Sequence, residues 1–365
     1  MVMPSPIRFD LPDVLSAKEP PEKRGLSRDG IRLLVADRTQ DKLTHARFRQ
    51  LPDFLKPGDC LVLNASRTLP ASLDAHLDSH LDGSHAFSQA GPRLQLRLAR
   101  HWQDDSWSAL ALDAEEQPWR GDLRGLRLSL GGGLRAQGLL AHVEDRDPVI
   151  ERLWKIRFDK SGIDLMERLC RLGSPIRYWY AAGPWDLDYY QTVYAREPGS
   201  MEMPSAGRAF TWKLLMDLRR KGIRTAFLVL HAGLSSYMDE AFDAGHRASE
   251  EQFRIGPVAA GIINKSKLEG GRIIAVGTTV VRALETVADN SGLIRRSEGS
   301  TRLRITGDSR LRSVDGLITG LHEPAASHLD LLSAFLPGKR LSAVYAEALG
   351  EKYLWHEFGD ANLIL

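Results

Sequence analysis

The sequence predicts an α/β fold, with a mostly parallel sheet, flanking helices and an inserted antiparallel β-barrel domain. In the second half of the chain, short apolar runs alternate with helical patterns. Between residues 71 and 175, apolar and polar residues alternate instead. Short apolar runs are typical of strands buried on both faces, and alternation is typical of antiparallel strands. We therefore expect an α/β domain made of 1–70 and 176–365, and a barrel domain made of 71–175.

The α/β prediction depends on three strands and three helices. The apolar runs that predict strands are 223–230, 272–277 and 314–319. The helical patterns, each ending close to a glycine or proline, are 211–221, 257–268 and 327–336. Because strands alternate with helices, the strands should run parallel. Ligand sites in such sheets lie beyond the carboxyl ends of the strands.

Histidines and threonines occupy those strand ends. His231, Thr278, Thr279 and His322 each follow a predicted strand, and His246 lies in a predicted loop. Histidine is the side chain best suited to proton transfer near pH 7, although a lone histidine is more often structural. Two histidines at neighbouring strand ends favour a functional role for at least one of them.

A turn between a predicted strand and a predicted helix is the candidate anion site. Gly277, Thr278 and Thr279 form this turn, and Arg282 follows one helical turn later. Free backbone N–H groups at a helix N-terminus bind carboxylates and phosphates. Threonine at this turn is explained equally well by plain capping of the helix, without any bound anion. Arg282 either pairs with the same anion or faces solvent.

The barrel prediction comes from alternating leucines at 94, 96 and 98 and at 126, 128 and 130, and from an alternating run at 154–158. Residues 74–89 are rich in His, Asp and Ser, which predicts an exposed loop. Its histidines and aspartates resemble a metal-ligand set, but a solvated polar loop has the same composition. We favour the loop and expect no metal.

Charge and motifs disfavour one class of function, and the arginine clusters of the chain suit either RNA phosphates or a solvated surface. The formal net charge is only +2, so a nucleic-acid surface would need local clusters of arginine. Two clusters are present: Arg295, Arg296, Arg302, Arg304, Arg310 and Arg312, and Arg93, Arg97, Arg100, Arg120, Arg124 and Arg127. A dinucleotide dehydrogenase is disfavoured because no G-x-G-x-x-G follows an early strand.

The two cysteines and the absence of long apolar runs indicate the cellular compartment of the protein. Cys60 and Cys170 are too few for a disulfide framework, and we expect both to be buried thiols in a reducing compartment. No run approaches the roughly 18 apolar residues of a membrane span, and the first twelve residues do not resemble a signal peptide. We therefore expect a cytoplasmic protein and no membrane contact.

Several motifs resemble the S-adenosylmethionine:tRNA ribosyltransferase-isomerase family of queuosine biosynthesis. Residues 277–285 match the family's Gly-Thr-Thr-x-Val-Arg-x-Leu-Glu almost without change, and 230–233 match its Leu-His-x-Gly. Other matching segments follow in the family's order: 9–12, 57–59, 64–67, 190–195, 197–199, 204–207, 315–319, 332–335 and 358–360. The chain is similar to this family over nearly its whole length.

The resemblance implies an α/β domain with an inserted β-barrel, and a particular reaction. In that family, the ribosyl portion of S-adenosylmethionine is transferred to the aminomethyl group of a 7-deazaguanine base in tRNA. Epoxyqueuosine forms, and adenine and methionine are released. The reaction needs a base beside the sulfonium, an acid for adenine and an anion site for the methionine carboxylate. S-adenosylmethionine is thus the implied co-substrate and tRNA the implied partner; the reaction needs no metal.

The matched motifs give the candidate site. The expected catalytic residues are His231, His246, His322 and Glu251. The expected S-adenosylmethionine-binding residues are Gly277, Thr278, Thr279, Arg282, Ser205 and Gly207. The expected acceptor-binding residues are Asn64, Arg67, Tyr190, Gln191, Arg302 and Arg304. A monomer is the working expectation for the oligomeric state, which no motif fixes.

Four motifs depart from the family pattern. Residues 204–210 read Pro-Ser-Ala-Gly-Arg-Ala-Phe instead of Pro-Thr-Ala-Gly-Leu-His-Phe, which places Ala209 where the family has histidine. Residues 246–251 read His-Arg-Ala-Ser-Glu-Glu instead of His-x-Met-His-Ser-Glu, so Ser249 replaces a second histidine. Residues 319–324 read Thr-Gly-Leu-His-Glu-Pro instead of Thr-Asn-Phe-His-Leu-Pro, with Gly320 replacing asparagine. Residues 175–180 read Pro-Ile-Arg-Tyr-Trp-Tyr instead of Pro-Leu-Pro-Pro-Tyr-Ile.

These departures concern the acceptor more than the use of S-adenosylmethionine. Two alternatives to the family reaction therefore stay open. The first is an enzyme of the same fold that uses S-adenosylmethionine on a different acceptor. The second is a non-catalytic RNA-binding relative.

Overall fold

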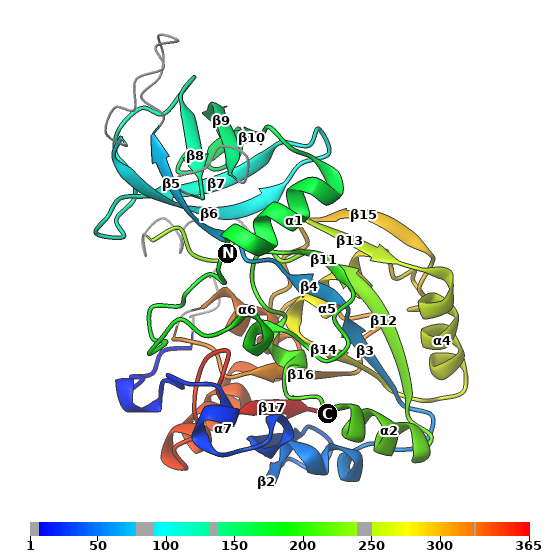
Figure 1. Cartoon of the computed structure of the whole chain (residues 1–365). Helices are drawn as coiled ribbons and strands as arrows, with labels where there is room; N and C mark the ends of the chain where they lie inside the picture. Colours follow the sequence, from blue (N-terminus) through cyan, green and yellow to red (C-terminus); the bar gives the residue numbers. More distant parts are fainter. Residues whose placement is uncertain (1–6, 78–90, 132–137, 239–249, 325) are drawn as a thin grey trace.

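The computed structural model describes residues 7–77, 91–131, 138–238, 250–324 and 326–365. It consists of an α/β body and a β-barrel that lies above one end of the body, with helix α1 (Gly162–Leu172) beside the junction (Figure 1). The predicted fold class is confirmed. The limits of the predicted domains, 71–175 for the barrel, stay a prediction.

One nine-stranded sheet forms the centre of the α/β body. Its order is β15-β13-β12-β3-β14-β16-β17-β1-β2. In that order the strands are Ser297–Thr301, Glu251–Ile255, Arg224–Leu230, Cys60–Asn64, Ile273–Val276, Gly316–Gly320, Ala361–Ile364, Arg32–Asp37 and Lys42–Arg47. The four central strands β12, β3, β14 and β16 are parallel. Strands β13 and β17 pair antiparallel with β12 and β16 on either side of this parallel core.

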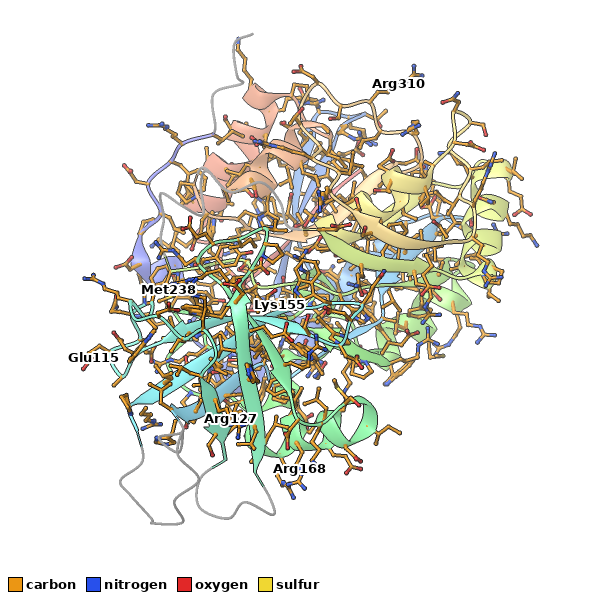
Figure 2. All side chains as sticks on the ribbon, turned by 90° about the horizontal axis from the view of Figure 1, so that it is seen from above. Glu115, Arg127, Lys155, Arg168, Met238 and Arg310 are labelled. Atoms are coloured by element: carbon orange, nitrogen blue, oxygen red, sulfur yellow. The ribbon has the colours of Figure 1, made fainter. Side chains whose placement is uncertain are left out.

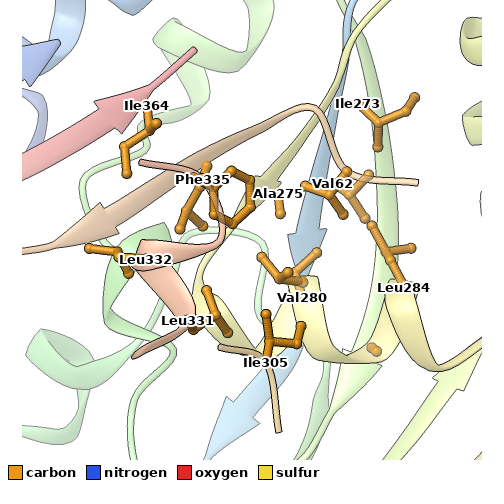
Figure 3. Packing of buried hydrophobic residues seen from close by; sticks show 14 of the residues in the cluster. Val62, Ile273, Ala275, Val280, Leu284, Ile305, Leu331, Leu332, Phe335 and Ile364 are labelled. Carbon is orange, nitrogen blue, oxygen red and sulfur yellow. The ribbon is translucent and has the colours of Figure 1, made fainter. Parts of the chain in front are cut away.

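Helices cover both faces of the sheet because its central strands are apolar on both faces. Cys60 and Val62 of β3 belong to one core cluster, whereas Leu61 and Leu63 belong to another. Helices α4 (Pro257–Leu268), α5 (Thr278–Val287), α6 (Ser327–Ser333) and α7 (Gly338–Gly350) pack on the first face. Helix α2 (Trp212–Arg220) packs on the second. Figure 3 shows the first core, where side chains of β3 and β14 meet those of α5 and α6.

The three predicted strands and three predicted helices are present, with ends shifted by a few residues. The largest shift is in α6, which ends at Ser333 rather than at 336 because Pro337 begins the approach to α7. Helix α2 is capped at its start by the Thr211 side chain, which accepts from the Leu214 N–H. The helix therefore begins where an N-cap residue meets the first apolar face.

The barrel is closed, with strand order β10-β7-β6-β5-β8-β9. The strands are Trp154–Phe158, Trp107–Leu112, Arg93–His101, Ser72–Leu77, Arg127–Leu130 and Leu139–Arg146. The loop prediction for 74–89 is wrong at its start, because Asp74 and His76 belong to β5. They alternate with Leu73 and Ala75, which are buried. Residues 78–89 of that prediction lie outside the described residues.

Two further sequence expectations can be compared with the structure. Cys60 is buried as expected, but Cys170 is exposed, because it lies on the outer side of α1, whose Leu165 and Leu169 face the barrel core. No described helix has the length and apolar character needed to cross a membrane.

Candidate active site at the carboxyl edge of the sheet

His231 lies in a cavity between the barrel and the sheet. It directly follows β12, and the cavity has a volume of about 150 Å³. The barrel contributes Arg100, His101 and Trp107 to the walls, and α1 contributes Met166. The remaining polar walls come from Tyr237 and from Glu250 and Gln252 beside β13. A cavity that mixes apolar walls with a few polar groups is typical of small-molecule sites.

The imidazole of His231 is held on one side and open on the other. Its Nδ1 is 2.8 Å from the Ser66 hydroxyl, which is 2.7 Å from the Ser200 hydroxyl. Gly199 lies against the ring so closely that a Cβ there would be 2.5 Å from it. Burial lowers the pKa of His231, which favours the neutral form. Nε2 has no hydrogen-bond partner among the described residues, so a neutral imidazole can accept a proton there.

Asn64 supports the segment that carries this histidine. Its Nδ2 donates to the Leu230 carbonyl at 2.8 Å, and its Oδ1 accepts from the Leu230 and Ser66 N–H groups. The residue is almost fully buried. Asn64 therefore fixes the end of β12 just before His231, and its predicted contact with the acceptor stays a prediction.

Two other predicted acceptor-binding residues, Tyr190 and Gln191, contact β4 in this structure, and their acceptor role stays a prediction. Tyr190 is buried, and burial raises the pKa of its hydroxyl to about 12. The Gln191 side chain exchanges two hydrogen bonds with the backbone of Thr68, at 3.0 and 2.8 Å. Both residues hold β4 (Ser66–Thr68), which pairs with β11 (Glu197–Ser200). Arg67, in contrast, is exposed on β4 and stays a candidate for acceptor binding.

The predicted anion turn leads into α5 as expected. Helix α5 begins at Thr278, after Gly277 with φ 98°, and no side chain caps it. This left-handed backbone region favours glycine. Thr278 and Thr279 are half-buried. A Cβ on Gly277 would lie 3.6 Å from Ala206, so the segment that contains Ser205 and Gly207 faces the turn. The predicted S-adenosylmethionine-binding segments thus come together in space.

Arg282 does not face solvent, and its predicted contact with the anion stays a prediction. Its Nη1 forms an ion pair with Glu251 of β13, and its Nε donates to the Leu303 carbonyl at 3.1 Å. Its Nη2 is buried without a partner among the described residues. Burial raises the pKa of Glu251, although Arg282 opposes that shift.

A second carboxyl, Glu202, lies close enough to Glu251 to interact with it. Glu202 accepts hydrogen bonds from the backbone and hydroxyl of Ser235, at 2.8 and 2.9 Å. Burial raises the pKa of Glu202, and the charge of Glu251 raises it further. A carboxyl whose pKa is raised in this way holds a proton more tightly than a solvated glutamate does, and can deliver it to a leaving group.

His231 and His322 do not share a cavity. Nε2 of His322 is 2.8 Å from the Thr319 hydroxyl, and its ring stacks on His328 with centroids 4.4 Å apart. Burial lowers its pKa. The predicted shared rim exists, but β12 and β16 are separated by β3 and β14. Three strand spacings amount to about 14 Å. The third predicted histidine, His246, and also Ser249 lie outside the described residues.

The six arginines of the cluster at 295–312 are all exposed. Arg302 pairs with Glu250 at 2.6 Å, and Arg304 pairs with Asp330 at 2.9 Å. In the barrel cluster, Arg97 and Arg100 are not free for phosphate, because Arg97 is buried beside Glu116 and Arg100 stacks on Trp102 in the cavity wall. No group of three metal-ligating side chains occurs among the described residues.

The sequence interpretation missed several residues of this site. Ser66 and Gly199 lie inside matched motifs, but only the fold brings them onto the His231 ring. Glu202 lies just after a matched motif, without any pattern of its own. Figure 2 shows how densely side chains fill the region between the barrel, where Lys155 is labelled, and the sheet.

The fold and the site define the class of protein: a two-part α/β and β-barrel chain with a polar site at the carboxyl edge of a parallel core. The family model described as "Queuosine biosynthesis protein" matches residues 5–364. The chain belongs to this family.

Relatives with full-length similarity carry one common name. A Methylobacterium protein is 37% identical over 98% of this chain and 96% of its own length. A Caldanaerobacter subterraneus protein is 34% identical over 98% of both. Both are named S-adenosylmethionine:tRNA ribosyltransferase-isomerase. A crystal structure of S-adenosylmethionine tRNA ribosyltransferase from Thermotoga maritima is 27% identical, with a TM-score of 0.52, covering 98% of this chain and 99% of that one.

Proposed function

We propose that this chain transfers the ribosyl portion of S-adenosylmethionine to 7-aminomethyl-7-deazaguanine in tRNA and isomerises it to epoxyqueuosine. The observation that carries the proposal is the meeting of segments 204–207 and 277–279 beside the Arg282–Glu251 pair. These segments are those through which the chain resembles the ribosyltransferase-isomerases. Relatives with that name match it over 98% of its length. A cytoplasmic location agrees with tRNA as substrate.

The site contains a group for each proton in this reaction. Neutral His231 can take the proton from the carbon beside the sulfonium at its open Nε2. Methionine leaves as a neutral thioether when its carbon–sulfur bond breaks. Departing adenine needs one proton, which Glu202 can supply because burial and the charge of Glu251 raise the pKa of its carboxyl. The free N–H groups at the start of α5 suit the methionine carboxylate.

Adenine release tests the proposal directly. The chain is incubated with S-adenosylmethionine and tRNA that carries the aminomethyl base, and adenine is measured by chromatography. Matched reactions contain the same tRNA with guanine at that position, or no tRNA. Release that requires the modified tRNA supports the family reaction.

The departures at Ala209 and Gly320 favour one alternative, an enzyme of this fold with a different acceptor. Adenine release that is independent of tRNA would support it. If the protein neither releases adenine nor binds S-adenosylmethionine, but still binds tRNA, it is a non-catalytic RNA-binding relative.

A further inference from the structure

A tight turn before β17 brings His356 and Glu357 to the carboxyl edge of the sheet. The Gly359 N–H donates to the His356 carbonyl at 3.0 Å, and the Asp360 side chain accepts from the Leu354 N–H at 2.8 Å. His356 adopts φ 72°, a left-handed conformation that is uncommon outside glycine. Such conformations are held by their surroundings and cluster at functional sites.

Departures from the family pattern line the small cavity next to this turn. Arg208, Ala209 and Gly320 lie in its wall together with Glu357. Ala209 replaces a family histidine, and Gly320 replaces a family asparagine. Two bulky polar side chains are thus absent from the wall, and a carboxyl is present.

Two other departures, Tyr180 and Glu323, contact the turn itself. Tyr180, where the family motif ends in isoleucine, stacks on His356 with centroids 4.0 Å apart. Its hydroxyl accepts a hydrogen bond from the Glu357 N–H at 3.4 Å. Glu323, where the family has leucine, lies 3.5 Å from Nδ1 of His356. Three segments far apart in the sequence therefore differ from the pattern at one place in the fold.

The Glu357 carboxyl is the unsatisfied group in this wall. Its Oε2 is buried without a hydrogen-bond partner among the described residues. Burial raises its pKa to about 7. The cavity of about 20 Å³ has room for one group the size of a water molecule. A buried carboxyl oxygen without a partner favours a hydrogen-bond donor close to it.

The charged neighbours of Glu357 leave it free to accept a cation or an N–H group. Arg28 and Arg208 line the same cavity, but both pair with Glu22, at 3.0 and 2.7 Å. Asp360 also lines it and is occupied by two backbone N–H groups.

The cavity adjoins the predicted S-adenosylmethionine site. Ser205, Ala206 and Thr319 line it, and Ala206 faces Gly277. The charges of Glu357 and Glu202 both reach Tyr178, whose hydroxyl pKa is raised mainly by burial. Glu357 therefore lines the same cavity as Ser205 and Ala206 of the predicted S-adenosylmethionine-binding segment.

We infer that Glu357 is a specificity-determining residue that accepts a hydrogen bond from a primary amino group of the acceptor. The inference rests on the proposed function and adds to it a residue that the family motifs do not contain. The family pattern has polar side chains at positions 209 and 320. In this chain the Glu357 carboxyl provides the polar contact instead. An acceptor with the amino group satisfies Oε2, which is otherwise unpaired, and is preferred by roughly 10- to 100-fold over an acceptor without it.

Calorimetry with two free bases tests this role. The probes are 7-aminomethyl-7-deazaguanine and 7-methyl-7-deazaguanine, which share the ring but differ in the amino group. The proteins are the full-length chain, Glu357→Gln, and Ala209→His, which fills the cavity. Glu298→Gln, which removes an exposed carboxylate on β15, is the matched control. The full-length chain and the control should prefer the aminomethyl base at least 10-fold, whereas Glu357→Gln and Ala209→His should lose this preference.

Each outcome decides the matter. Equal affinity for both bases in the unaltered chain, or a preference that persists in Glu357→Gln, overturns the inference. The affinity of each variant for S-adenosylmethionine, measured in parallel, should stay within 2-fold, roughly 0.4 kcal/mol; a larger loss in Glu357→Gln means that its role is structural and also overturns the inference. The proposed function is tested separately by adenine release with modified tRNA. The role of Glu357 and the proposed function can therefore fail independently.

Discussion

The single side chain with the clearest chemical task is His231. The Ser66 hydroxyl holds Nδ1, and Gly199 fixes the ring plane, so that Nε2 meets the cavity. A proton acceptor of this kind acts in the transition state and contributes little to ground-state binding.

We expect His231→Ala to lower kcat by about 10²- to 10⁴-fold while the Kd for S-adenosylmethionine stays nearly constant. Single-turnover adenine release and calorimetry measure the two quantities. His101→Ala, on the barrel side of the same cavity, is the comparison. A loss in both quantities to the same extent would mean that His231 only shapes the cavity.

The raised pKa of Glu357 predicts how the stability of the fold depends on pH. Its folded-state pKa is raised from 4.5 to about 7, so the folded protein binds this proton more tightly than the unfolded chain does. Stability should therefore fall as the pH rises from about 4.5 to 7, by at most about 2 kcal/mol for this group after allowing for partial contact with solvent. The Glu357→Gln variant should lack this part of the pH dependence. Urea unfolding at pH 5, 6 and 7 checks it; parallel curves for both proteins would contradict the raised pKa.

At the scale of elements, α5 and β13 are joined by the Arg282–Glu251 pair. Both side chains are mostly buried, with exposed fractions of 15% and 11%. Removal of one partner leaves an uncompensated buried charge, which costs more than the pair itself contributes.

Arg282→Ala should therefore destabilise the fold by about 3–5 kcal/mol, and the double variant Arg282→Ala/Glu251→Gln should recover part of that loss. Urea unfolding of the four proteins of the cycle gives the coupling energy. Additive losses would show that the two groups do not interact in solution.

The sequence predicted best those elements in which buried residues follow a simple pattern along the strand or helix. The apolar runs of β12, β14 and β16 predicted the parallel core, because such strands are buried on both faces. Strand β5 was misread because Asp74 and His76, which face outward, hid the alternation with Leu73 and Ala75. Polar residues on the exposed face of a strand have the same composition as a loop. The two cannot be distinguished from sequence when the partner strands are unknown.

The candidate site was less predictable than the fold. The matched motifs identified Glu251 and Arg282 as candidates. The ion pair between them could not be predicted, because it depends on which side chains of β13 face α5. Glu250 and Gln252 face the His231 cavity, so the alternate residue Glu251 faces α5. The same limit applies to His322, whose distance from His231 depends on a strand order that no local pattern contains.

At the scale of the whole molecule, exposed arginines lie on separate parts of the surface. Arg310, beyond β15, and Arg127, on the barrel, appear at opposite ends of the view in Figure 2. A tRNA that reaches the carboxyl edge can use either group, and charge reversal distinguishes them.

We expect tRNA binding to weaken steeply with salt, because arginine–phosphate contacts release counterions. Replacement of Arg302, Arg304, Arg310 and Arg312 by glutamate should reduce the slope of log K against log salt by about 0.7–0.9 for each phosphate that is no longer neutralised. Reversal of Arg120, Arg124 and Arg127 on the barrel is the matched comparison. Anisotropy titrations at several salt concentrations between roughly 50 and 200 mM measure both slopes. A salt-insensitive interaction would contradict tRNA as the substrate.

The place of β17 in the sheet has a consequence for the order in which this chain can fold. Residues 361–364 lie between β16 and β1, and they are the link through which the hairpin of β1 and β2 joins the parallel core. On the ribosome, residues 32–47 are made more than 300 positions earlier than their partner strand. Contacts of such sequence separation form late. The first hairpin must therefore wait, with one edge unpaired, until β17 has been made.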